Sequence, residues 1–119
     1  SAVTGEKWTR ADVDLASERI SNMLRVMTAI SFNINEGSTN LREDHDTICN
    51  WVFDKEPEFK AFEEGTVKLD RADMELAKDM FYEEMGWDVK TGIPTRATLE
   101  RVGLGYMADD LAARGLLPA

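Results

Sequence analysis

The side chains best suited to chemistry in this sequence are its single histidine and single cysteine, four residues apart at His45 and Cys49. On a helix this spacing places both on one face, as potential zinc ligands beside Asp44 or Asp46. Structural zinc sites need four ligands and catalytic sites three, and the sequence offers two strong ones. We therefore interpret His45 as an exposed side chain and Cys49 as a buried one packing beside Trp51.

Adjacent carboxylates are the next candidates, because two acids can share the roles of general acid and base. They occur as Glu63–Glu64, Glu83–Glu84 and Asp109–Asp110. Neighbouring helical residues point in different directions, and the sequence gives no sign of a pocket that would shift their pKa values. We expect these carboxylates to be solvated, and we predict no catalytic, cofactor-binding or metal-binding residue in this chain.

The stretch Thr95–Tyr106 resembles a helix-turn-helix, with Gly103 in the turn and Arg96 and Arg101 available for phosphate contacts. Asp109–Asp110 follow directly and would face the nucleic-acid backbone at close range. The net charge of −9 also repels nucleic acid. We predict no nucleic-acid partner, and we keep a free-standing helical interaction or DNA-binding module as the alternative function.

Length and composition favour one soluble domain covering residues 1–119. Charged residues make up 31% of the chain, and no apolar run approaches the roughly 20 residues that a membrane-spanning helix needs. A single cysteine cannot form an internal disulfide, so a cytoplasmic location is the default expectation. Residues 1–5 lack an initiator methionine and a signal peptide, which is typical of a cut end.

Thr9 and Asp12 form a capping-box pattern that predicts a long helix from Arg10 to about Asn33, ending before Gly37. Apolar residues recur at the spacing of one helical face. We expect them to face the core: Val13, Ala16, Ile20, Met23, Leu24, Met27, Ile30 and Ile34.

Residues 36–46 are polar and lack an apolar period, so we predict a surface loop. Residues 47–53 are apolar and form either a short helix or an extended piece tucked onto the core, closed by Pro57. We expect Phe59 and Phe62 to hold the following segment against the core.

Asp70 and Asp73 predict the start of a second helix, and Gly86 sits where a C-terminal glycine belongs. Its expected apolar face consists of Met74, Ala77, Met80, Phe81 and Met85. Methionines at helical spacing could also suit a soft metal, but we interpret Met23, Met27, Met74 and Met85 as core filling.

Two short helices are predicted to complete the chain, one opened by Pro94 and Thr95 and running through Val102, the other covering residues 106–114. No strand-like alternation is long enough to build a sheet. The sequence therefore predicts an all-α single domain of about four helices with a tucked apolar loop segment.

The second half of the chain is similar to the C-terminal signature of the aldehyde:ferredoxin oxidoreductase family. The family pattern is tyrosine-tyrosine, arginine-glycine-tryptophan-aspartate, then glycine-x-proline-threonine and leucine-glycine-leucine. The matching segments are Met80–Asp88, Gly92–Thr95 and Leu99–Leu104. Phe81 and Met85 depart from the pattern, standing where the family has a tyrosine and an arginine.

Upstream segments extend the resemblance over nearly the whole chain. They are residues 2–5 with Trp8, Glu18–Ile20, Phe32–Asn33, Glu36–Gly37 and Asp46–Ile48. Cys49 stands where proline is common, and residues 105–119 run past the usual leucine-glycine-leucine end.

The resemblance implies the C-terminal helical domain of a tungsten, or sometimes molybdenum, bis-pterin enzyme that also carries a four-iron cluster. The intact enzyme would oxidise aldehydes to carboxylic acids and pass electrons to ferredoxin. No residue here matches the family's cofactor motifs, and we do not transfer a cluster-ligand role to Cys49. We expect the isolated chain to be inactive and to pack on the cofactor-bearing remainder of the parent enzyme through apolar surface near Trp8, Phe32 and Trp51.

Overall fold

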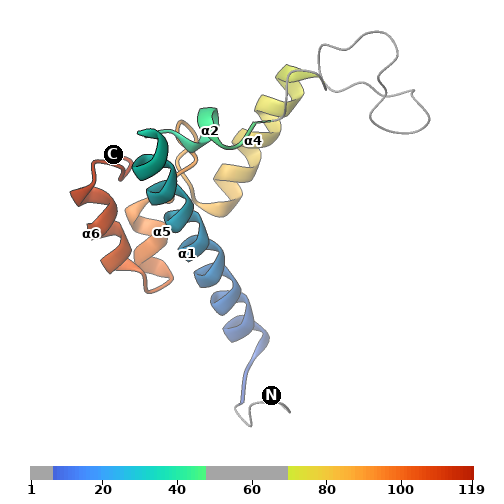
Figure 1. Ribbon diagram of the computed structural model, residues 1–119. Coiled ribbons are helices and arrows are strands. Elements are labelled where there is room, and N and C mark those ends of the chain that lie inside the picture. Colours follow the sequence, from blue (N-terminus) through green and yellow to red (C-terminus); the bar gives the residue numbers. More distant parts are fainter. Residues whose placement is uncertain (1–6, 48–69) are drawn as a thin grey trace.

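The computed structural model describes residues 7–47 and 70–119, which form five α-helices and no strand (Figure 1). The helices are α1 (Arg10–Glu36), α2 (Leu41–Asp44), α4 (Arg71–Met85), α5 (Arg96–Arg101) and α6 (Gly105–Ala113). An isolated β-bridge pairs Trp87 with Pro94 in the turn between α4 and α5. The predicted all-α class is confirmed, with α2 as an additional short helix.

The start of α1 is the predicted capping box. The Thr9 hydroxyl accepts a hydrogen bond from the Asp12 amide at 3.1 Å, and the Asp12 carboxylate accepts one from the Thr9 amide at 2.9 Å. The helix continues three residues beyond the predicted Asn33, to Glu36. It ends there because Gly37 adopts a left-handed conformation, with φ of 69°. The Gly37 amide donates hydrogen bonds to the Asn33 and Phe32 carbonyls, which closes the helix.

The predicted core face of α1 is largely wrong. The residues that α1 buries are Asn22, Arg25, Val26 and Ala29. Met23 and Ile30 do pack against the core. Val13, Ile20, Leu24, Met27 and Ile34 are instead exposed, each over at least half of its surface. The helix turns two polar side chains inward because both find partners there, which an apolar period alone does not indicate.

The polar stretch 36–46 is not simply a loop, because α2 forms within it. The Asn40 side chain caps this helix by accepting a hydrogen bond from the Glu43 amide at 3.2 Å. Leu41 is 1% exposed and belongs to the hydrophobic core. The tucked segment predicted after it, together with Phe59 and Phe62, lies outside the described residues apart from Thr47.

Both ends of α4 are as predicted. The Asp70 carboxylate accepts hydrogen bonds from the Ala72 and Asp73 amides at 2.7 and 3.3 Å, and Gly86 closes the helix with φ of 74°. The predicted face is wrong in part, because Met80 and Phe81 are exposed.

Methionine fills the core only in part. Of the four methionines interpreted as core filling, Met23 packs against the core, Met74 and Met85 are half-buried, and Met27 is exposed. On α4 the most deeply buried side chain is instead Tyr82, at 1%. A residue that the apolar pattern did not include therefore anchors α4.

The hydrophobic core lies where α6 contacts both α5 and α1 (Figure 1). Its buried members are Val26, Ala29, Leu41, Ile93, Leu99, Val102, Leu104, Ala108, Leu111 and Leu116. Three of them come from residues 105–119, so this tail is part of the core. None of the helices in the two described ranges is long and apolar enough to cross a membrane.

Gly86 allows the end of α4 to approach the start of α5 closely. Its carbonyl accepts hydrogen bonds from the Thr98 hydroxyl at 2.6 Å and from the Thr95 hydroxyl at 3.2 Å. A Cβ atom added at Gly86 would lie 2.3 Å from the Thr98 hydroxyl oxygen. A side chain at this position therefore conflicts both with the positive φ and with its neighbour.

Gly86→Ala is expected to lower the free energy of unfolding by about 2–3 kcal/mol, combining left-handed strain with a clash. Gly37→Ala is the matched control, because Gly37 also has a positive φ but a Cβ there meets nothing within 4 Å. The control should lose only about 1 kcal/mol. Chemical denaturation followed by circular dichroism measures both, and equal losses would contradict the clash.

Candidate functional site

The guanidinium of Arg25 is a buried charge, since this residue is only 9% exposed. Its Nη1 donates to Asp46 Oδ1 at 3.0 Å, and its Nη2 donates to the other carboxylate oxygen. Its Nε donates to the Gly92 carbonyl at 2.8 Å. Arg25 therefore joins α1 to the segment after α2 and to the turn between α4 and α5.

The Asp46 carboxylate has two further hydrogen-bond partners besides Arg25. The Tyr82 hydroxyl of α4 donates to Oδ2, and the His45 ring nitrogen Nδ1 lies 2.7 Å from Oδ1. The Asp46 side chain is 19% exposed. Both oxygens of a largely buried carboxylate are thus satisfied, as burial of a charge requires.

Aromatic rings cover the guanidinium. Its central carbon lies 4.4 Å from the Trp87 ring centroid and 5.8 Å from the Tyr82 ring centroid, which are cation–π distances. The Trp87 indole donates to the Asn22 side-chain oxygen at 2.9 Å. Asn22 and Arg25 therefore face inward on α1 because each has a specific partner on the α4 side.

The electrostatics of this centre favour fixed charges. Burial alone would raise the pKa of Asp46, but hydrogen bonds from Arg25, Tyr82 and His45 outweigh it and hold that pKa well below its usual value. Burial and the bond to Asp46 raise the pKa of Tyr82 above its usual value. Near neutral pH the carboxylate stays ionised and the phenol protonated, so the pair is suited to holding elements together rather than transferring protons.

Arg42 of α2 forms a second centre, which also lies close to the Tyr82 ring. Its guanidinium binds Glu75 at 2.8 Å and Asp79 at 2.5 Å, both on α4, and donates to the Val89 carbonyl at 2.7 Å. The Arg42 guanidinium carbon lies 5.6 Å from the Tyr82 ring centroid. Two arginines from different helices therefore fix the position of α4.

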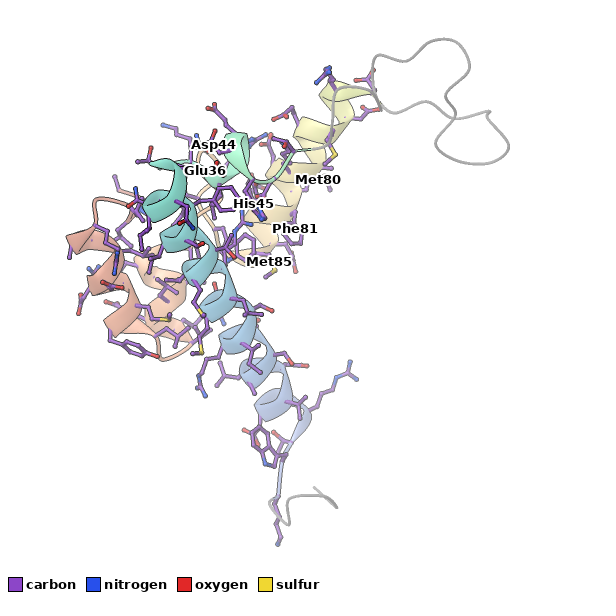
Figure 2. The ribbon with its side chains drawn as sticks, viewed as in Figure 1. Glu36, Asp44, His45, Met80, Phe81 and Met85 are labelled. Carbon is purple, nitrogen blue, oxygen red and sulfur yellow. The ribbon has the colours of Figure 1, made fainter. Side chains whose placement is uncertain are left out.

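A hollow of ≈ 470 Å³ opens beside the first centre, between α4 and the segment after α2. Asp46 and Tyr82 contribute to its lining, with Met74 and Phe81 from α4 and His45 opposite. In Figure 2, His45 and Phe81 come from these two different elements. Thr47, where the first described range ends, also lines the hollow.

Of the residues considered as metal ligands, His45 and Asp44 both contact other protein side chains. The His45 ring contacts Asp46 and packs edge-on against Phe32 at 4.9 Å between ring centroids, and Asp44 accepts a hydrogen bond from Ser38 at 2.6 Å. Cys49 lies outside the described residues. Within the described ranges, no group of three or more His, Cys, Asp or Glu side chains is arranged to hold a metal ion.

The paired carboxylates and the two candidate phosphate-binding arginines form ion pairs or face solvent. Glu83–Glu84 are exposed, and Glu63–Glu64 lie outside the described ranges. Asp109 pairs with Arg96 at 2.9 Å, and Asp110 pairs with Arg114 at 3.2 Å. Arg101 pairs with Glu18 at 2.7 Å. Phosphate contacts by these arginines would require breaking contacts with carboxylates of the same chain.

Sequence reasoning missed Arg25, Asp46 and Tyr82 as a unit, although one signal pointed to it. Arg25 is the only charged residue between Arg19 and Glu36, in a chain that is 31% charged. A lone charge within a long uncharged helical stretch is typical of a buried, paired side chain. Its partners could not be identified from the sequence, because they lie 21 and 67 residues away.

Residues 1–104 match the family described as "Aldehyde ferredoxin oxidoreductase, domains 2 & 3". No solved structure matches this chain. The matched range includes every residue of the Arg25 and Arg42 centres, together with α1, α2, α4 and α5.

Asp46→Asn is expected to destabilise the fold by about 3 kcal/mol, because it leaves the Arg25 charge buried without a counter-charge. Asp109→Asn is the matched control: it also removes an arginine partner, but the Asp109 side chain is 74% exposed. The control should change stability by less than about 1 kcal/mol. Urea denaturation of both variants checks this, and similar losses would rule out a special role for the buried pair.

The contribution of Asp46 should also depend on pH. Because its folded-state pKa is lowered, the stabilisation is complete above the unfolded-state pKa of about 4 and is lost as the pH falls through the folded-state pKa. The difference in unfolding free energy between the unmodified chain and Asp46→Asn should therefore be largest near pH 7 and shrink toward about pH 2. A difference that stayed constant across this range would mean that the ionised carboxylate is not its source.

Proposed function

The chain belongs to the aldehyde ferredoxin oxidoreductase family, and from this membership we propose that it is the C-terminal helical domain of an oxidoreductase of that kind. In the intact enzyme, aldehydes would be oxidised to carboxylic acids and the electrons passed to ferredoxin. The match over residues 1–104 is the observation that carries the proposal. Residues 105–119 extend the same core, which supports one domain over residues 1–119.

The cofactors that the family implies are a tungsten or molybdenum bis-pterin and a four-iron cluster. A four-iron cluster is held by four cysteine thiolates, whereas this chain has one cysteine. The described residues also supply no group of three or more side chains suited to a metal ion. The residues present therefore do not fit the four-iron cluster, and other parts of the parent enzyme would have to hold it.

The role we propose for this domain is mechanical. Arg25 connects α1 to the segment after α2 through a largely buried ion pair, and Arg42 connects α2 to α4 through an ion pair with the exposed Glu75. Helix α6 contacts both α5 and α1. A domain fixed in this way can present a rigid surface to a cofactor-bearing body and help exclude water from it. Its partners would be the remainder of the parent enzyme and, for the intact enzyme, ferredoxin, in the cytoplasm.

We expect the native polypeptide that contains this segment to be several times longer than 119 residues and to carry tungsten or molybdenum together with iron. Capture with an antibody against this domain, followed by mass and elemental analysis and an assay of aldehyde oxidation, tests the proposal. The isolated 119-residue chain is the control and should hold none of these metals and oxidise no aldehyde. A metal-free native protein of this length, or stoichiometric metal in the isolated chain, would contradict it.

A further inference from the structure

The outward face of α1 lacks charge over an unusual length. Arg25 is the only charged residue between Ile20 and Asn35, and it is buried. On the outside of the same stretch, four apolar side chains are 56–65% exposed: Ile20, Leu24, Met27 and Ile34. Their spacing of four, three and seven residues keeps them on one side of the helix. With Ser31 between them, these residues form what we call the uncharged face.

A hollow continues this face toward α2. Leu24, Met27 and Ser31 line it from α1, together with Phe32, and His45 lines it from the segment after α2. Phe32 is half-buried, as the edge-on contact with His45 requires. Trp8, the other aromatic residue expected at an apolar surface, is 45% exposed, and Trp51 lies outside the described ranges.

The composition of this surface is that of the centre of a protein–protein interface. Such centres are depleted in charge and enriched in large apolar side chains, whereas solvent-facing helix surfaces are normally charged. The one polar side chain of the face has a partner within α1, since the Ser31 hydroxyl accepts a hydrogen bond from Asn35 at 3.2 Å. Beside the face, the Thr28 hydroxyl donates to the Leu24 carbonyl at 2.9 Å. Covering the face would therefore leave few polar groups without partners.

A second copy of this chain is a less favourable occupant than an uncharged partner. Each copy carries a net charge of −9, so self-association would bring like charges together.

We propose that the uncharged face of α1, with the hollow beside Phe32, is the surface by which this domain docks on the remainder of its parent polypeptide. This inference rests on the proposed function. The matched family is described as domains 2 and 3 of one enzyme, which implies at least one further domain in the same polypeptide, and all of α1 lies within the matched residues. That further domain is the neighbour we assign to this face. The partner surface would be apolar and uncharged, with a side chain entering the hollow.

Coverage of the face is tested by thiol labelling of the native polypeptide. Leu24→Cys should react about tenfold more slowly than Lys90→Cys, a control at an exposed position in the turn after α4, if docking removes Leu24 from solvent. Mass spectrometry of the labelled peptides separates these thiols from native cysteines. Equal labelling rates would overturn the proposal.

The identity of the partner is tested by photo-crosslinking. Met27 is replaced by p-benzoylphenylalanine in the native polypeptide, and the crosslinked peptides are sequenced by mass spectrometry, with the same probe at Lys90 as the control. Crosslinks to a segment outside these 119 residues are expected. Crosslinks to a second copy or to another part of the same 119 residues would overturn the docking proposal, as would no crosslink beyond the control.

The failure of this inference is distinguishable from failure of the proposed function. If the unmodified native polypeptide contains metal and oxidises aldehydes while the labelling and crosslinking results are negative, only the docking surface is wrong. A native polypeptide with no residues beyond these 119 would overturn both.

Discussion

The buried guanidinium of Arg25 is the constraint on which the arrangement of the other elements depends. A cation that is 9% exposed must be paired and hydrogen-bonded, or its desolvation would oppose folding. Asp46 and the Gly92 carbonyl supply those partners from segments 21 and 67 residues away. Satisfying one side chain therefore fixes the end of α2 and the turn after α4 relative to α1, and Tyr82 adds α4 through its bond to Asp46.

A constraint of this kind acts mainly against alternative packings, because its partners are costly to separate. Replacing a buried ion pair by apolar residues is often neutral, whereas removing one partner is costly, so such pairs disfavour alternative packings. Tyr82 shows the same principle, because guanidinium groups from α1 and α2 both lie within 6 Å of its ring centroid. An α4 rotated to bury the apolar Met80 and Phe81 would remove the Tyr82 hydroxyl from Asp46 and expose the ion pair.

These contacts explain which parts of the fold the sequence could predict. Helix ends at Thr9, Asp70 and Gly86 were predicted because capping depends on residues within three or four positions of one another. The faces of α1 and α4 were misassigned because an apolar period assumes that apolar residues point inward. Here the inward positions belong to Arg25 and Tyr82, whose partners come from distant segments that no local pattern identifies.

The misassigned face of α1 and the proposed docking surface have one physical origin. A helix of 27 residues that directs Asn22 and Arg25 inward must place Ile20, Leu24 and Met27 elsewhere on its circumference. In a chain that is 31% charged, keeping these outward positions apolar and free of charge has no benefit for a surface that stays in water. The face makes physical sense if α1 lies between two interfaces. Within this domain, Val26 and Ala29 pack in the core beside the buried Asn22 and Arg25, and the outer, apolar interface is with the rest of the enzyme.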